Sequence, residues 1–110
     1  MIINILGTDY EIIRQNKTEN PKLEDNNGLC EPYSKQIIID KFEEEKQDKM
    51  VVDNLDEFIK KVIRHEIVHA FFLESGLDIC SDYATNEELV DWIARQGIKI
   101  YNAWTKAGAI

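Results

Sequence analysis

Hydrophobic positions divide the chain into a strand-like half and a helix-like half. The first half holds short apolar runs, rich in β-branched residues, at 2–6, 10–14, 28–33 and 35–40. Runs of this kind, separated by turn-forming residues, are typical of strands. We expect them to pair as two hairpins, one turning at Gly7 and one near Ser34 and Lys35, with polar surface loop between.

Apolar positions in the second half recur at helical spacing. A first helix is expected from Leu55, capped by Asp53 or Asn54 and stopped by Gly76. For a second helix, running to about residue 104, the sequence "TNEE" suggests Thr85 as the N-cap and Glu88 as its capping-box partner.

This order of elements predicts one α+β domain over residues 1–110. Its small, mostly antiparallel sheet of three to four strands would pack against two long helices. The stretch at 41–50 is rich in charge and is expected to connect the two halves.

Composition narrows the classes of function. No apolar run approaches the ~20 residues that span a bilayer, and the N-terminus lacks the basic start of a signal peptide. With two cysteines and no export signal, the expected setting is the reducing cytoplasm, with no membrane contact. A net charge of −8 disfavours nucleic acid. Lys60, Lys61 and Arg64 are expected to form a solvated outer face of the first helix.

The first helix carries the only two histidines of the chain, in the sequence "HEIVH". His65 and His69 lie four residues apart, so both imidazoles lie on one face of the helix and can bind one ion. Zn²⁺ accepts such ligands, and Glu66 could then act as general base on a water acidified by the ion. The alternative is a pair of neutral histidines packed in the core, but three polar groups on an apolar stripe are costly unless something binds them.

These residues resemble the HExxH motif of the zincin metallopeptidases. The resemblance implies that His65 and His69 bind one Zn²⁺ per chain and that Glu66 is the catalytic base. It leaves the third protein ligand to be found.

Several acidic or sulfur side chains could provide that ligand, since no histidine remains. Glu74 is rotated by about 140° from His69 around the helix, so it is not expected to reach the same ion. The candidates in the following loop are Asp78, Cys80 and Asp82. The favoured candidate is Glu87.

The sequence around Glu87, "NEELVD", resembles the NExxxD element of the glutamate-ligand zincins. That resemblance implies that Glu87 binds the metal and that Asp91 braces a ligating imidazole.

Parts of this chain also resemble two smaller groups of zincin peptidases. "HEIVHAFF" followed by an acidic helix resembles the ImmA/IrrE-like peptidases, compact intracellular enzymes often encoded near phage or mobile-element repressors. The strands preceding the motif resemble the SprT-like group, which completes its site with a further histidine that is lacking here. ImmA/IrrE-like sequences have small residues after the ligand glutamate, where this chain has Leu89 and Val90. The resemblance implies a protein substrate such as a transcriptional repressor.

Other site residues are predicted from their positions. Tyr83 is the favoured donor to the transition-state oxyanion, with Tyr33 and Tyr101 as alternatives. The segment 36–40 is expected to be an edge strand that binds substrate by main-chain pairing, through Gln36, Ile37, Ile38 and Ile39.

The leading prediction is therefore a zinc-dependent endopeptidase that hydrolyses a protein or peptide by metal-activated water. The alternative is a zinc-binding structural or interaction module without turnover, in which Cys80 would be the fourth ligand. No oligomeric state is predicted.

Overall fold

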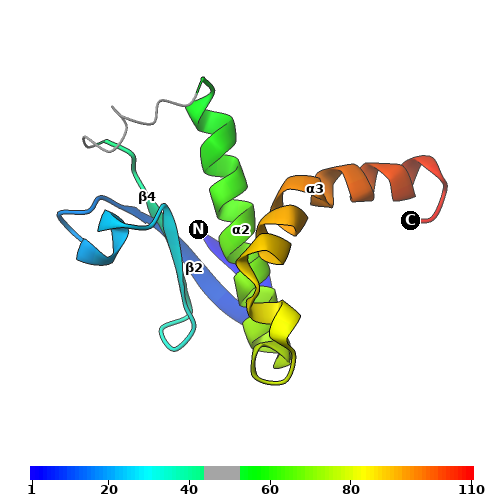
Figure 1. Ribbon diagram of the computed structural model, residues 1–110, viewed down its shortest axis with the longest axis horizontal. Helices are drawn as coiled ribbons and strands as arrows, with labels where there is room; N and C mark the ends of the chain where they lie inside the picture. The colour runs from blue at the N-terminus through cyan, green and yellow to red at the C-terminus, as the bar shows by residue number, and fades with distance from the viewer. Residues whose placement is uncertain (44–52) are drawn as a thin grey trace.

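Strands fill the first half of the chain and helices the second, as predicted (Figure 1). In this computed structural model, residues 1–43 and 53–110 are described. Residues 44–52, most of the predicted charged connector, lie outside the described residues. The described elements form one small α+β domain, which confirms the predicted class.

A mixed sheet of four strands forms one layer, in the order β1-β2-β4-β3. Its strands are β1 (Ile2–Ile5), β2 (Thr8–Gln15), β3 (Gly28–Glu31) and β4 (Gln36–Asp40). The pairs β1–β2 and β3–β4 are antiparallel, which confirms both hairpins, whereas β2 and β4 run parallel.

The first hairpin turns at Leu6 and Gly7. Both residues have positive φ, at 49° and 94°, as a two-residue turn between right-twisted strands requires. Asn4 Oδ1 accepts a hydrogen bond from the Gly7 N–H, which supports the turn. Pro32 lies just past the end of β3, where its missing N–H breaks no ladder bond.

β4 is a central strand, so its prediction as the exposed edge is wrong. It is flanked by β2 on one side and β3 on the other, and Ile37, Ile38 and Ile39 are all buried. Neighbouring strand residues point to opposite faces, so a continuous apolar run is typical of a strand that is buried on both faces of its sheet. The edges of the sheet are β1 and β3.

One long helix, α2 (Leu55–Ser75), lies against the sheet and contacts β1, β3 and β4. It is capped by Asn54, whose side chain accepts from the Glu57 N–H, and it ends at Gly76 in the left-handed conformation, both as predicted. Its apolar face joins the strands in a common core that includes Ile5, Tyr10, Ile37, Ile39, Val62 and Ala70.

The cap of the second helix, α3 (Glu87–Lys106), differs from the prediction. Asn86 is the N-cap, with its side chain accepting from the Leu89 N–H at 2.8 Å. Thr85 instead ends the 3-10 turn η3 (Asp82–Thr85), and its hydroxyl donates to the Asp82 carbonyl. Asparagine caps at least as well as threonine, so the helix begins one residue later than the capping-box pattern suggests.

α3 packs against α2 and η3 rather than against the sheet, which corrects the expectation that both helices cover it. Val90 and Ala94 are the buried residues of this contact. The C-terminal half projects away from the rest of the chain (Figure 1), and residues 101–110 are all exposed. The sheet therefore positions α2, and α2 positions the N-terminal half of α3.

We predict that Asn86→Ala lowers the free energy of unfolding by about 1 kcal/mol, because it leaves the first N–H groups of α3 without their cap. Thr85→Ala should cost less, since it removes only a hydroxyl bonded to an exposed carbonyl. Urea titration of both variants measures the difference. A larger loss in Thr85→Ala would restore Thr85 as the cap.

Candidate metal centre

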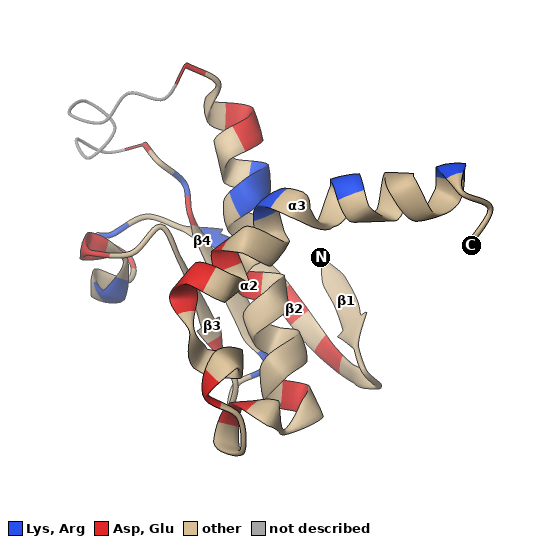
Figure 2. Ribbon diagram, turned by 45° about the vertical axis from the view of Figure 1, so that its right-hand side comes forward, with Lys and Arg blue, Asp and Glu red and all other residues tan. Residues whose placement is uncertain are grey.

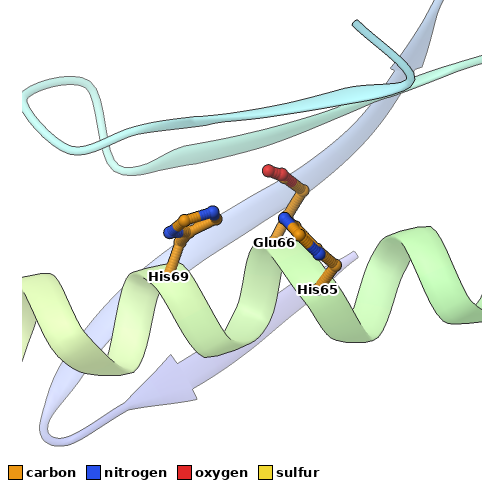
Figure 3. A group of neighbouring side chains, drawn as sticks. All are labelled: His65, Glu66 and His69. Atoms are coloured by element: carbon orange, nitrogen blue, oxygen red, sulfur yellow. The ribbon is translucent and has the colours of Figure 1, made fainter. Parts of the chain in front are cut away.

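Three polar side chains project from the same side of α2, toward the β3–β4 hairpin (Figure 3). They belong to His65, Glu66 and His69, and their ligand atoms all lie within 4.8 Å of one another. The two imidazole rings are 4.9 Å apart at their centroids and inclined at 68°. The i, i+4 spacing on one helix thus brings both rings to a single point, as the sequence predicts.

α3 brings a second carboxylate to that point. Glu87 is the first residue of the helix, and its oxygens lie 3.0 Å from His65 Nε2 and 3.0 Å from His69 Nε2. One carboxylate therefore faces the same nitrogen of both rings. Glu87, the predicted third ligand, thus lies next to both histidines.

Asp91 lies one helical turn further along α3 and faces the other nitrogen of His65. Its Oδ1 is 3.1 Å from His65 Nδ1, and it also accepts hydrogen bonds from Lys61 and Arg95. Burial disfavours the charged carboxylate, but these hydrogen bonds outweigh it and lower the pKa of Asp91 to about 2. Asp91 is thus an anion that can hold the Nδ1–H of His65, as predicted for the bracing residue.

His65 faces a carboxylate oxygen at each ring nitrogen. A neutral imidazole carries one N–H, so it can donate to Asp91 or to Glu87, but not to both. A cation bound by Nε2 and Glu87 would be compatible with both contacts, because Nε2 would then offer its lone pair while Nδ1–H donates to Asp91. The donor set fits a metal ion.

The spacing of the donors also fits Zn²⁺. Two ligand atoms about 2.0–2.1 Å from a tetrahedral ion lie roughly 3.3 Å apart. The Nε2-to-carboxylate distances of 3.0 Å are a few tenths of an ångström shorter. A small outward movement of the exposed Glu87 side chain would therefore admit the ion. Two imidazoles and one carboxylate would provide three protein ligands, the number found in catalytic rather than structural zinc sites.

Burial adjusts the protonation of the remaining groups. It lowers the pKa of His69, which keeps that ring neutral near pH 7 and its lone pair available. Burial also raises the pKa of the Glu66 carboxyl to about 7, and only 6% of this residue is exposed. A carboxyl with this pKa can both accept and release a proton near neutral pH.

Strand β3 lies directly against Glu66. A Cβ added at Gly28 would come within 3.0 Å of Glu66 Cγ and 3.0 Å of Val62 Cγ1. A larger residue at this position would push these side chains away by a few tenths of an ångström, so glycine favours the close packing of the strand on the helix. This contact brings the free edge of the sheet beside the candidate base.

A cavity of about 540 Å³ opens over the site. Its lining includes the four residues of the candidate site, Asp91, and several residues of β3 and the turn before it. It therefore runs between the edge strand on one side and the paired helices on the other.

The other predicted ligands lie in different surroundings. Glu74 accepts from Tyr10 and Lys35, away from the histidines. Cys80 is exposed and its thiol donates to the Gly76 carbonyl. Asp78 lines the cavity, whereas Cys80 and Asp82 are not among its lining residues. The structure thus brings Glu87, and not this loop, into contact with both histidines.

No tyrosine of residues 1–43 and 53–110 lines the cavity, so the predicted oxyanion donor is not found there. Tyr83 packs edge-to-face on Phe72, with ring centroids 6.1 Å apart. Tyr33 is fully exposed in the β3–β4 turn, and Tyr101 lies on the projecting part of α3. These positions fit packing and surface tyrosines.

Lys61 lines the cavity but was not identified as a site residue from the sequence. Its side chain is only 23% exposed and pairs with Asp91, and Arg64 donates to the Ala94 carbonyl of α3. The prediction of a solvated basic face therefore holds only for Lys60, which pairs with Glu57 at the surface. Helical spacing placed Lys61 one turn before His65, but its partner could be recognised only once α3 was located.

Comparison with protein-family models, with curated proteins and with solved structures gives no match to this chain. Among the described residues, neither long helix has the apolar length needed to cross a membrane. The case for a function therefore rests on the geometry of the site.

We predict that replacing Glu66 by glutamine stabilises the metal-free protein, and only at higher pH. The fold raises the pKa of Glu66 from 4.5 to about 7. The contribution of this protonated carboxyl to the free energy of unfolding is therefore fully present below pH 4.5 and is lost as the pH rises through 7. Glu66→Gln cannot ionise and should gain up to about 3 kcal/mol over wild type at pH 8, with little difference at pH 4. Chemical denaturation with a chelator present measures both. An equal difference at the two pH values would contradict burial as the cause.

Proposed function

We propose that this domain is a zinc-dependent endopeptidase of the zincin type. His65, His69 and Glu87 would hold one Zn²⁺, Asp91 would orient His65, and Glu66 would act as general base. The observation that carries the proposal is the convergence of Glu87 on the Nε2 atoms of both histidines, 3.0 Å from each. It joins groups from two helices in a donor set with one open position.

The chemistry follows from the positions of the protein groups. A bound Zn²⁺ supplies Lewis acidity, which lowers the pKa of water and polarises a carbonyl. Glu66 is buried beside the histidines, where its carboxylate can take a proton from the attacking water. The same carboxyl can return that proton to the nitrogen of the leaving amine, as peptide hydrolysis requires.

The free edge of β3 is the surface that we assign to the substrate, in place of β4. Asp40 N–H donates to the Asn27 carbonyl, so these residues form a hydrogen-bonded pair of the β3–β4 ladder. Such pairs alternate along an antiparallel ladder, so the main-chain groups of Gly28 and Cys30 face outward. An extended peptide can pair with them beside Glu66.

The charge near the site favours a basic or neutral substrate segment. Acidic residues gather around the N-terminal end of α3 and the neighbouring turns (Figure 2), and Asp25 and Asp78 line the cavity. A protein regulator, such as the DNA-bound repressor suggested by the ImmA/IrrE-like resemblance, is the proposed substrate class.

A purely structural zinc site is less well supported. Such a site favours four protein ligands, and Cys80 was the predicted fourth. Cys80 bonds to the Gly76 carbonyl and lies outside the cavity lining.

The test of the proposal compares three single variants in zinc content and in casein cleavage. Glu66→Gln should retain zinc but lose at least about 10²-fold in cleavage rate, because it removes the base and not a ligand. Glu87→Ala should lose both zinc and cleavage. Glu88→Ala, the matched control one residue along α3, should keep both.

Cleavage by Glu66→Gln at the wild-type rate would contradict the peptidase mechanism. Full zinc retention by Glu87→Ala would instead contradict the ligand set and return attention to the loop at 77–82.

We predict that Cys30→Pro impairs cleavage while zinc remains bound, because proline removes the outward N–H of the edge strand without breaking a bond to β4. Cys30→Ala keeps that N–H and is the matched control. The ratio of kcat/KM for the two variants on one peptide measures the effect. Equal values would show that substrate does not pair with β3. Ile38, by contrast, cannot serve for this test because its N–H faces β3 within the sheet.

A further inference from the structure

Lys61 lies on α2 one turn before His65 and reaches the same carboxylate. Its Nζ is 3.0 Å from Asp91 Oδ1, the oxygen that lies 3.1 Å from His65 Nδ1. Phe58 lies beneath the ammonium group, with 5.3 Å between Nζ and the ring centroid. The lysine is therefore held between an aromatic ring and the carboxylate, and it is mostly buried.

The two oxygens of Asp91 have separate partners. Oδ2 accepts from Arg95 Nε at 2.7 Å, along α3, whereas Oδ1 faces Lys61 and His65, both on α2. Arg95 is largely exposed, and an i, i+4 pair of this kind could form on α3 without α2. Lys61 is thus the cation on α2 that pairs with Asp91.

We propose that Lys61 is a positioning residue for the metal centre: it holds Asp91 Oδ1 against His65 Nδ1, fixing the ring orientation and its Nδ1–H tautomer. This rests on the proposed function, since the tautomer matters because it leaves the lone pair of Nε2 free for the ion. Without Lys61, Asp91 can turn toward Arg95, and His65 loses the acceptor that selects its tautomer.

A positioning role and a purely electrostatic role of Lys61 would change the affinity for Zn²⁺ in opposite directions, so a binding measurement can distinguish them. Lys61 is a cation near the site, so if it acted only through its charge, removing it would strengthen binding of Zn²⁺. If it acts by positioning, removing it weakens binding. The loss should be about 10-fold, at the lower end for groups outside the ligand set, because Lys61 acts through Asp91.

The first measurement is the zinc Kd of the full chain, by chelator competition, for Lys61→Met, Lys61→Arg and Lys60→Met. We expect weaker binding in Lys61→Met and recovery in Lys61→Arg, which retains a donor. Lys60→Met is the matched control: it removes the same charge from the neighbouring position, where the side chain is 64% exposed and pairs with Glu57, and it should leave Kd unchanged. Unchanged or tighter binding in Lys61→Met would overturn the inference.

The second measurement does not depend on zinc. In the metal-free Glu87→Ala protein, Asp91 is the carboxylate that the structure places at His65. Nitrogen-15 NMR of the two histidines should show the Nδ1–H tautomer of His65, and adding Lys61→Met should give a mixture. The same tautomer with and without Lys61 would overturn the inference. If the wild-type chain binds no zinc, the proposed metal centre is wrong. The NMR comparison would then still show whether Lys61 holds Asp91 against His65.

Discussion

The site depends on the packing of α3 against α2, because each helix carries only part of it. α2 alone holds two imidazoles and a buried carboxyl on an apolar face, which is costly without partners. Glu87 and Asp91, one turn apart on α3, face opposite nitrogens of His65. Val90 and Ala94 are the buried residues of α3, and polar contacts such as Lys61 to Asp91 and Arg64 to the Ala94 carbonyl also join the two helices. A metal ion shared between the helices would add to this contact.

The parts of the site that could be predicted from the sequence depend on local geometry. His65 and His69, and likewise Glu87 and Asp91, share a helix face because their i, i+4 spacing sets it. The choice of Glu87 as a ligand came from the resemblance to the NExxxD element and not from the spacing, so the wrong choice of Thr85 over Asn86 as the cap did not affect it. Both hairpins were likewise predictable, since short connections and turn residues determine them.

The parts that could not be predicted depend on contacts between distant segments. Whether β4 lies at an edge is decided by its parallel pairing with β2, which no short-range pattern specifies. Lys61 is one of two adjacent lysines, and only the position of α3 makes one a partner of Asp91 and leaves the other at the surface. Gly28 is similar, because the advantage of glycine at this position arises from the approach of β3 to Glu66.

X-ray absorption at the zinc edge of the zinc-loaded protein can show directly whether two histidines and a carboxylate hold the metal ion. We predict two imidazoles and oxygen ligands at about 2.0–2.1 Å, with no sulfur in the first coordination shell. A sulfur ligand at about 2.3 Å would contradict this account, because it would place Cys80 or Cys30 on the metal. A spectrum lacking the two imidazoles would contradict it as well.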